Sequence, residues 1–319
     1  MNDIIQERRN CHMEKRIAII GAGPAGYTAA QELSKAGCQI DIFDKEAALG
    51  GAIYTGIPEY RMSKVFLDKV YQQLKADEHV TFHFNTFIDK EAFAKLRSDY
   101  DAILLAPGAQ VENTFHFETG KGVLAGLSLL YDLNIRKNHD AYKKYKKAIV
   151  WGGGNVAMDC ARSLIRILDD VTVVYRRSEA EITANKSEIR DARKEGVKFD
   201  LLRNVIDMQR DDQGHFKGAT IIKMELGEPD ESGRRSPVPV KGSEYFMPAD
   251  LIVMAIGQKV DLSVFDPSLE MTDDHHTNED KVYIAGDALT GPKTIGSALI
   301  EGRAVAKEIA SGLHPISGT

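Results

Sequence analysis

The chain has 319 residues, with 47 acidic residues against 41 Lys and Arg and a net charge of −6. This length allows one large domain or two of ordinary size, and the acidic balance argues against nucleic acid or an anionic membrane as a partner. Three cysteines without a CxxC pair exclude a disulfide framework and fit a reducing compartment. A charged start and the lack of any apolar run near 18 residues predict a cytoplasmic protein without a membrane span.

Residues 1–15 have no clear pattern and are expected to form an arm. The next segment predicts a strand, a glycine-rich turn, a helix and a second strand. An apolar run at 16–20 leads into Gly-Ala-Gly-Pro-Ala-Gly at 21–26, followed by a helical segment at 27–35 and a strand at 39–43. In such a turn the glycines allow a tight bend, a close approach of a pyrophosphate and helix packing, and the helix N-terminus favours the phosphates.

Asp44 ends the second strand, 23 positions after Gly21 (44 − 21 = 23). A carboxylate there accepts hydrogen bonds from both ribose hydroxyls and repels a 2′-phosphate, which predicts FAD or NAD rather than NADP. The alternative is a glycine turn used only for packing. The residues assigned to this first site from the turn and its acid are Gly21, Gly23, Pro24, Ala25, Gly26, Asp44 and Lys45.

The same order of elements recurs later in the chain. A strand at 147–151 precedes a glycine turn at 152–157, a helix at 158–168 and a strand at 171–174. The position that matches Asp44 is Tyr175, followed by two arginines, so an acid is absent and phosphate-binding guanidiniums are present. This predicts an NADPH site, unless the arginines form salt bridges with Glu179 or Glu181. The assigned residues are Gly152, Gly153, Gly154, Asn155, Val156, Ala157, Arg176 and Arg177.

Two further buried strands end in small-residue turns and are expected to mark the crossings between domains. The strand at 101–105 runs into Ala106 and Gly108, assigned to the first site, and the strand at 250–254 runs into Gly257, assigned to the second. The segment 211–242 is expected to be a β-hairpin and loop. The fold class is therefore α/β with two Rossmann-like domains: a discontinuous FAD domain at 16–112 and 256–319, and an inserted NADPH domain at 120–255.

The last strand, predicted at 281–285, leads into Gly286, Asp287 and a small-residue helix at 297–309. This run resembles the C-terminal FAD motif of two-dinucleotide flavoproteins. The resemblance implies that Asp287, beside Gly286, binds the ribityl chain. It also implies that Thr294 and Ile295 direct backbone N–H groups at the flavin pyrimidine ring, where a helix N-terminus stabilises negative charge.

Three stretches, at 49–61, 152–162 and 173–178, resemble the small subunit of glutamate synthase and its relatives. The resemblance implies that Gly50 and Gly51 lie along the flavin; Arg61 either touches a cofactor or packs locally. That family usually carries an N-terminal cysteine-rich iron–sulfur domain, and Cys11 alone cannot hold a cluster. Thioredoxin reductases carry a CxxC in the NADPH domain, whereas Cys160 stands alone and is expected to be a buried, inert thiol.

Three other positions have ordinary structural interpretations. Trp151 is expected in the core, Asp159 in the first helical turn where it stabilises the helix dipole, and His275 with its neighbour in a surface loop. No metal site is predicted.

The sequence therefore predicts an FAD-dependent oxidoreductase that takes hydride from NADPH. Hydride transfer to flavin N5 needs no acid, base or nucleophile, so no side chain is assigned as catalytic. The expected acceptor is a separate protein: a ferredoxin, an iron–sulfur subunit or a glutamate-synthase-like partner. The alternatives are a stand-alone NADPH reductase of small acceptors such as quinones, and a flavin- and NADP-binding sensor with little turnover. The assembly is left open, with a homodimer as one alternative.

Overall fold

The computed structural model describes residues 15–229, 233–272 and 274–313. The predicted N-terminal arm, apart from Lys15, and Cys11 lie outside the described residues. Contacts divide the chain into two compact units. Unit 1 runs up to Tyr54 and then takes Ser63–Val111 and the chain from Lys259 onward, whereas unit 2 consists of Thr55–Met62 and Glu112–Gln258.

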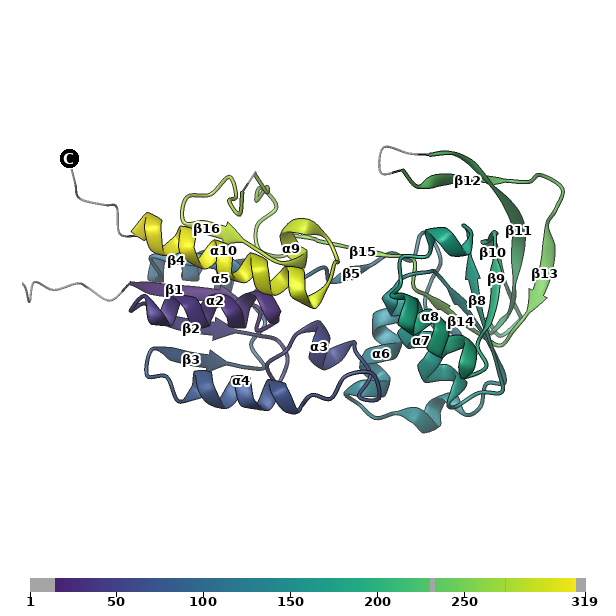
Figure 1. Cartoon of the computed structure of the whole chain (residues 1–319), viewed down its shortest axis with the longest axis horizontal. Helices are drawn as coiled ribbons and strands as arrows, with labels where there is room; N and C mark the ends of the chain where they lie inside the picture. Colours follow the sequence, from purple (N-terminus) through teal and green to yellow (C-terminus); the bar gives the residue numbers. More distant parts are fainter. Residues whose placement is uncertain (1–14, 230–232, 273, 314–319) are drawn as a thin grey trace, which may run out of the picture. The chain divides into compact units, whose positions relative to one another are not determined.

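Unit 1 is built on a parallel sheet of five strands in the order β16-β4-β1-β2-β3 (Figure 1). Apolar runs at 16–20 and 102–105 supply its buried central strands, as expected for a parallel sheet covered on both faces. The strands are β1 (Arg16–Ile20), β2 (Gln39–Phe43), β3 (Val80–His83), β4 (Ala102–Leu105) and β16 (Val282–Ile284).

Alternate residues of the unit 1 strands face two helical layers. Ala18 and Ile20 of β1 pack in one cluster with Phe93 of α5, whereas Ile19 points toward α2, where its Cγ2 lies 3.3 Å from the Cβ position of Gly26. Helices α2 and α10 lie side by side (Figure 1). The helices of this part of the chain are α2 (Pro24–Lys35), α3 (Ala52–Thr55), α4 (Val65–Lys75), α5 (Lys90–Asp99), α9 (Asp287–Thr290) and α10 (Ile295–Leu313).

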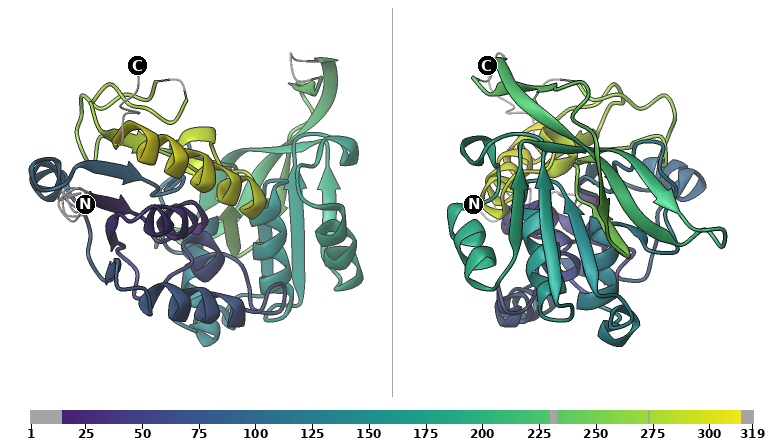
Figure 2. Two further views of the ribbon diagram at one scale, coloured as in Figure 1. Left: turned by 60° about the vertical axis from the view of Figure 1, so that its left-hand side comes forward. Right: turned by 90° about the vertical axis from the view of Figure 1, so that its right-hand side faces the viewer.

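Unit 2 has a second parallel sheet of five strands in the order β6-β14-β7-β8-β9. Its edge strand β6 comes first in the unit, whereas the edge strand β16 of unit 1 comes last in the chain. The helices of unit 2 cover one face of its sheet, and an antiparallel sheet covers the other (Figure 2, right). The parallel strands are β6 (Val123–Ala125), β7 (Lys147–Trp151), β8 (Asp170–Tyr175), β9 (Lys198–Leu201) and β14 (Leu251–Met254). The helices are α6 (Gly126–Asn134), α7 (Asn155–Ile165) and α8 (Lys186–Lys194), with short 3-10 turns η2 (His139–Tyr142) and η3 (Glu179–Glu181).

The antiparallel sheet consists of β10 (Arg203–Arg210), β11 (Phe216–Pro229), β12 (Arg235–Pro239) and β13 (Tyr245–Pro248), with β11 pairing with each of the others. The β11–β12 hairpin reaches beyond the end of the parallel sheet (green in Figures 1 and 2). The connecting strands β5 (Val111–Glu112) and β15 (Gln258–Lys259) form a separate two-stranded sheet. No helix within the described part of the chain is both long enough and apolar enough to span a bilayer.

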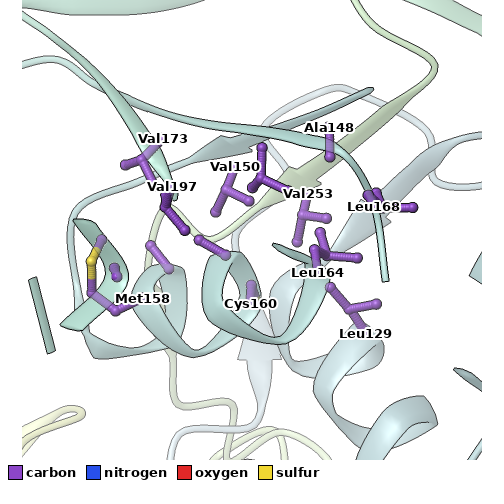
Figure 3. Close-up of a cluster of buried hydrophobic side chains, with 14 of the residues drawn as sticks. Leu129, Ala148, Val150, Met158, Cys160, Leu164, Leu168, Val173, Val197 and Val253 are labelled. Carbon is purple, nitrogen blue, oxygen red and sulfur yellow. The ribbon is translucent and has the colours of Figure 1, made fainter. Parts of the chain in front are cut away.

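The core of unit 2 explains two of the sequence interpretations. Val150 faces α7 in the cluster of Figure 3, where Cys160 has no exposed surface, whereas Ile149 and Trp151 face the antiparallel sheet. The Trp151 indole Nε1 donates to Oδ1 of Asn204 over 3.1 Å. The predictions of a core tryptophan and a buried thiol are therefore confirmed, and burial raises the pKa of Cys160 well above its usual value.

Both helices after the glycine turns begin three residues earlier than the sequence indicates. The first starts at Pro24, where proline is well suited to the opening helical position, and the second starts at Asn155. Since α7 begins at Asn155, Asp159 lies in the second turn, and the prediction that it stabilises the dipole from the first turn is wrong. The hairpin expected within 211–242 is confirmed as β11–β12.

Candidate cofactor sites

In the first glycine turn, two glycines are required because the protein leaves no space for a Cβ atom, whereas a third has space for one. A Cβ on Gly21 would lie 2.2 Å from the carbonyl oxygen of Ala106, and one on Gly26 would lie 1.9 Å from that of Gly21. A Cβ on Gly23 would meet nothing nearer than Cα of Gly51, at 3.8 Å. The protein itself therefore leaves room at Gly23, which fits a backbone that must stay bare for a phosphate.

Asp44 holds this turn in place. Its Oδ2 accepts from the Ala22 N–H over 2.7 Å and its Oδ1 accepts from the Glu46 N–H over 2.8 Å. The residue is 9% exposed, and burial raises its pKa while the two backbone hydrogen bonds oppose that shift. Two ionised oxygens offer about four lone-pair sites, so the carboxylate keeps acceptor capacity for ribose hydroxyls beside the turn.

The other assigned residues of unit 1 meet the same turn or follow neighbouring strands. The Gly50 N–H donates to the Ala22 carbonyl over 2.9 Å, and a Cβ on Gly51 would approach Gly23 Cα to 2.8 Å. Gly108, after β4, has a φ of +74° and open space where a Cβ would stand. The Lys45 ammonium instead donates to Gln110 Oε1 over 2.7 Å.

The closing motif of unit 1 packs against α2 at its first turn. A Cβ on Gly286 would lie 2.8 Å from that of Ala25. Asp287 Oδ1 accepts from the Lys293 N–H over 3.2 Å, and burial raises the pKa of Asp287.

Thr294 and Ser297 cap each other at the start of α10, which Ile295 opens. Of the two N–H groups expected to face the flavin, that of Thr294 donates to Ser297 Oγ over 3.0 Å. The Ile295 N–H, at the first position of α10, is the other N–H group expected to face the flavin.

In the second glycine turn, too, some glycines have no space for a Cβ atom and one has space. A Cβ on Gly152 would lie 2.1 Å from the Ala255 carbonyl oxygen, whereas one on Gly154 would meet only Thr183 Oγ1, at 3.7 Å. Gly153 is covered by a ring, because a Cβ there would lie 2.5 Å from Tyr175. The carbonyl of Gly153 accepts from the N–H groups of Thr183 and Ala184, both over 3.1 Å.

The remaining assigned residues surround this turn. Asn155 Oδ1 accepts from the Asn185 N–H over 3.0 Å, and Val156 packs against Gly126. Ala157 is fully buried in the place of the third glycine. Gly257 has a φ of +111° with open space at its Cβ position, and its carbonyl accepts from the Asn113 N–H over 3.0 Å.

The two arginines after β8 occupy different environments. Arg176 is exposed, whereas Arg177 is 9% exposed and its Nε donates to the Arg235 carbonyl over 2.8 Å. Glu179 pairs with Arg193 at 2.8 Å and Glu181 pairs with Arg235 at 3.2 Å. The alternative that these acids neutralise the two arginines is therefore wrong, and no salt bridge within the described residues involves Arg176 or Arg177.

Arg61 packs locally, against carboxylates of unit 2. Its Nη1 donates to Asp159 Oδ2, and its Nε lies 3.2 Å from Glu188 Oε1. Beside it, the Tyr60 ring lies under the guanidinium groups of Arg162 and Arg166, at 5.0 and 3.8 Å.

These contacts explain why 55–62 groups with unit 2, although the sequence places it within an FAD domain at 16–112. The charged partner of Asp159 is the guanidinium of Arg61, and the residue lies beyond the first turn of α7, the turn in which the helix dipole would act on it.

His275 is largely buried and contacts two glutamates, unlike an exposed surface-loop residue. Its ring nitrogens lie 2.7 Å from Glu301 Oε2 and 3.0 Å from Glu308 Oε1, with the side chain 13% exposed. The expected loop position is right for His276, which is exposed.

Sequence reasoning missed Tyr175 as the cover of the glycine turn, and it missed Arg234, whose Nη2 lies 3.3 Å from the Tyr175 hydroxyl. A second Arg-Arg pair at 234–235 is the feature of the sequence that could have drawn attention to Arg234.

Each site lies where several parallel strands of one sheet end. In unit 1 the turn after β1, Asp44 after β2, Gly108 after β4 and Gly286 after β16 share the carboxyl edge. Unit 2 places its turn, its arginines and Gly257 after β7, β8 and β14 in the same way. Ligands of open α/β sheets bind at this edge, and bare glycine backbone fits a pyrophosphate in each unit. The two units define a flavoprotein oxidoreductase with separate FAD and NADPH sites.

Comparison with known proteins agrees with this class. The family model for pyridine nucleotide-disulphide oxidoreductases matches residues 15–302, and the chain belongs to that family. It is 38% identical to the NADP(+)-dependent formate dehydrogenase subunit beta of Moorella thermoacetica over 92% of this chain and 43% of that protein. It is 31% identical to the glutamate synthase [NADPH] small chain of Escherichia coli K12, over 94% of this chain and 69% of the relative. The chain spans about half the length of several curated relatives that it matches.

Solved structures share the fold. FprA of Mycobacterium tuberculosis in complex with NADPH matches with a TM-score of 0.82 at 19% identity, covering 94% of this chain and 84% of FprA. Thioredoxin reductase of T. acidophilum matches with a TM-score of 0.67 at 17% identity, covering 94% and 99%. The α/β fold with two dinucleotide-binding units, the NADPH-dependent oxidoreductase family and the cofactors FAD and NADPH are thus confirmed.

Proposed function

We propose that this protein takes hydride from NADPH bound to unit 2, passes the electrons through FAD bound to unit 1, and delivers them to a separate redox protein. The observation that carries the proposal is the repeated turn with opposite charge beside it. Asp44 holds the first turn through the Ala22 N–H, whereas Arg176 stands exposed at the matching strand end of unit 2. A carboxylate suits ribose hydroxyls and a guanidinium suits a 2′-phosphate.

The proposed FAD residues line the carboxyl edge of the unit 1 sheet. The turn at 21–26 cradles the pyrophosphate, Asp44 accepts from the ribose, and Asp287 accepts from the ribityl hydroxyls. Ile295 contributes the N-terminus of α10, whose partial positive charge favours an electron-rich ring. Bound FAD supplies a ring system that accepts a hydride and returns electrons one or two at a time. Arg61 is left out of this set, because its guanidinium is held by Asp159 and Glu188.

The proposed NADPH residues are the glycine turn Gly152–Gly154, in which Gly154 has the open backbone, the N-terminus of α7 and Arg176. These groups bind and orient the nucleotide, and no proton needs to be moved by a side chain for hydride transfer. Arg177 contributes charge near the site while its Nε holds the Arg235 carbonyl.

The acceptor is proposed to be a protein that carries iron–sulfur clusters or a comparable one-electron centre. Relatives over this length are a formate dehydrogenase subunit beta, a glutamate synthase small chain and the NADPH-Fe(3+) oxidoreductase subunit beta of Geobacter sulfurreducens, so their names describe parts of larger assemblies. Direct reduction of a disulfide is not supported, because Cys38 and Cys160 are both buried and apart from any second thiol among the described residues.

Rapid mixing with NADPH under anaerobic conditions tests the first half of the reaction. In the wild type we expect fast loss of the visible flavin absorption with NADPH and slower loss with NADH. In Arg176→Ala we expect the fast loss at low NADPH to disappear. Arg193→Ala is the matched control, since it removes an arginine that pairs with Glu179 elsewhere on the same unit. A flavin that stays oxidised for minutes in the wild type would indicate a sensor instead.

Reoxidation of the reduced protein tests the acceptor. We expect a clostridial-type ferredoxin to reoxidise the flavin in single-electron steps and faster than an equal concentration of a quinone such as menadione. The opposite order would replace the protein acceptor with a small quinone.

A further inference from the structure

Helix α7 begins without a side-chain cap. Its N-cap residue is Gly154, which has no side chain to accept from the first N–H groups of the helix. The side chain of Asn155, the first helical residue, accepts through Oδ1 from the Asn185 N–H over 3.0 Å instead. The start of α7 therefore offers backbone N–H groups to an anion, which agrees with the phosphate position proposed above.

One side chain borders the open space at Gly154. Apart from its neighbours in the chain, a Cβ on Gly154 would have one heavy atom of the described residues within 4 Å, which is Oγ1 of Thr183 at 3.7 Å. Thr183 is exposed and lies 29 positions later in the sequence (183 − 154 = 29), in the connection between η3 and α8. Its hydroxyl therefore lies at the edge of the space proposed for a phosphate.

The segment that carries Thr183 is fixed to the glycine turn through its backbone. The N–H groups of Thr183 and Ala184 both donate to the carbonyl oxygen of Gly153 over 3.1 Å. The next N–H group, that of Asn185, donates to the Asn155 side chain. Because these contacts use only backbone groups of the segment 183–185, they hold position 183 in place whatever side chain it carries.

The hydroxyl of Thr183 makes only a weak contact with the protein. Its oxygen lies 3.3 Å from the Gly153 carbonyl oxygen. That carbonyl has two lone pairs and already accepts from two N–H groups over the shorter distance of 3.1 Å. A hydroxyl proton rotates to suit its surroundings, and a hydrogen bond to a charged phosphate oxygen is stronger than one to a neutral carbonyl. A phosphate at the turn would therefore receive this hydrogen bond in place of the carbonyl.

We infer that Thr183 is a further binding residue of the NADPH site and that its hydroxyl donates a hydrogen bond to the pyrophosphate. The inference rests on the NADPH site proposed above and adds to it a residue outside both the glycine turn and the arginine pair. Because NADPH and NADH share the pyrophosphate, Thr183 adds affinity for both nucleotides, whereas Arg176 distinguishes them.

Titration calorimetry of the FAD-loaded full chain with NADP+ and with adenosine 2′-monophosphate tests the inference. Both probes carry the 2′-phosphate, but only NADP+ carries a pyrophosphate. Thr183→Val keeps the shape of the side chain and removes the hydroxyl. We expect NADP+ to bind about 10-fold or more weakly, as for loss of a charged hydrogen bond, and adenosine 2′-monophosphate to change by less than about twofold. Equal weakening of both probes, or no weakening of NADP+, would overturn the inference.

Two further variants show whether the hydroxyl itself is responsible. Thr183→Ser retains the hydroxyl and should bind NADP+ within about twofold of the wild type. A loss in Thr183→Ser as large as in Thr183→Val would assign the effect to the methyl group and overturn the inference. Thr220→Val makes the same chemical change on β11 of the antiparallel sheet and should affect neither probe.

Arg176→Ala separates the inference from the proposed site. It should weaken both probes, since both carry the 2′-phosphate. If it does so while Thr183→Val binds NADP+ like the wild type, the inference alone fails. If the wild type binds neither NADP+ nor adenosine 2′-monophosphate, the proposed NADPH site fails and the inference fails with it.

Discussion

The guanidinium of Arg61 donates through Nη1 to Oδ2 of Asp159, a residue 98 positions later in the chain. The two side chains are 15% and 4% exposed, and Glu188 completes the cluster through Nε of Arg61 at 3.2 Å. Arg61 and Asp159 belong to two of the three stretches by which the sequence resembles the glutamate synthase small subunit. Two motifs that appear separate in the sequence thus form one structural unit, in which the loop at 55–62 is fixed to α7 and α8.

Removal of Arg61 should destabilise unit 2. Arg61→Ala leaves Asp159 and Glu188 buried together without their shared cation, and breaking a buried ion pair costs about 3 kcal/mol. Denaturant unfolding followed by fluorescence of Trp151, which lies in unit 2, measures the loss. Lys35→Ala removes an exposed cation that pairs with Glu32 and should have no resolvable effect. A similar, negligible effect of both substitutions would contradict the role given to Arg61.

Asp159 should make unit 2 less stable as the pH rises from about 4 to about 7. Burial raises its pKa from 3.8 to about 7; Arg61 and Arg162 oppose the shift and Glu188 adds to it. The folded state therefore binds a proton between these values that the unfolded state has released, so stability declines with pH up to about 7 and then levels off. Against Asp159→Asn, the wild type should lose roughly 1–3 kcal/mol between pH 5 and 8. A difference in unfolding free energy between the wild type and Asp159→Asn that stays constant from about pH 5 to 8 would contradict the raised pKa of Asp159.

Substitution of Gly23 or Gly154 by alanine should weaken cofactor binding without destabilising the fold. A Cβ on Gly23 or Gly154 meets nothing in the protein closer than 3.8 or 3.7 Å, so alanine at either position should leave the fold intact. Gly23→Ala should then lower FAD content, and Gly154→Ala should weaken NADPH by about 10-fold or more, since each methyl group occupies the space of a phosphate. Each variant is the other's control. Equal loss of thermal stability in both would show that these glycines serve packing.

Asp44 should serve the turn as well as the cofactor. Asp44→Asn replaces one acceptor oxygen with a donor that faces a backbone N–H, either that of Ala22 or that of Glu46. We expect a loss of about 1–3 kcal/mol in the FAD-free protein, together with weaker FAD binding. Unfolding of the apoprotein and flavin fluorescence on reconstitution measure the two effects separately. An apoprotein as stable as the wild type would limit Asp44 to ligand contact.

Much of the fold is readable from the sequence because both sheets are made of short, continuous apolar runs. The strands predicted at 16–20, 39–43 and 147–151 coincide with β1, β2 and β7. Helices α4 and α5 were not identified, since their apolar residues are sparse: Leu67 and Leu74 in α4, and Phe93 and Leu96 in α5, are the buried ones. Strand β10 alternates weakly, with Val205 as its one fully buried residue, and its place depends on pairing with β11.

The candidate sites are readable where they are local. Each glycine turn and the charge about 23 residues later follow from one βαβ pattern. Tyr175 on Gly153, Arg234 at the end of β8 and the Arg61–Asp159 pair could not be predicted, because each depends on a contact between segments that only the tertiary fold brings together. Thr294 shows the reverse case: its assignment rested on resemblance, and a local cap with Ser297 uses its N–H.

Unit 1 surrounds unit 2 in the chain, and this has a consequence for synthesis on the ribosome. The edge of β4 is paired by β16, and Gly302 of α10 fits against Ala25, where a Cβ would come within 2.4 Å of the Ala25 carbonyl oxygen. Neither contact exists until the segment from Val282 onward has emerged. Unit 2 is complete in the nascent chain by Gln258. Unit 1, which we propose binds FAD, is therefore begun first and completed last, and the edge of β4 stays unpaired and accessible to other chains while unit 2 folds.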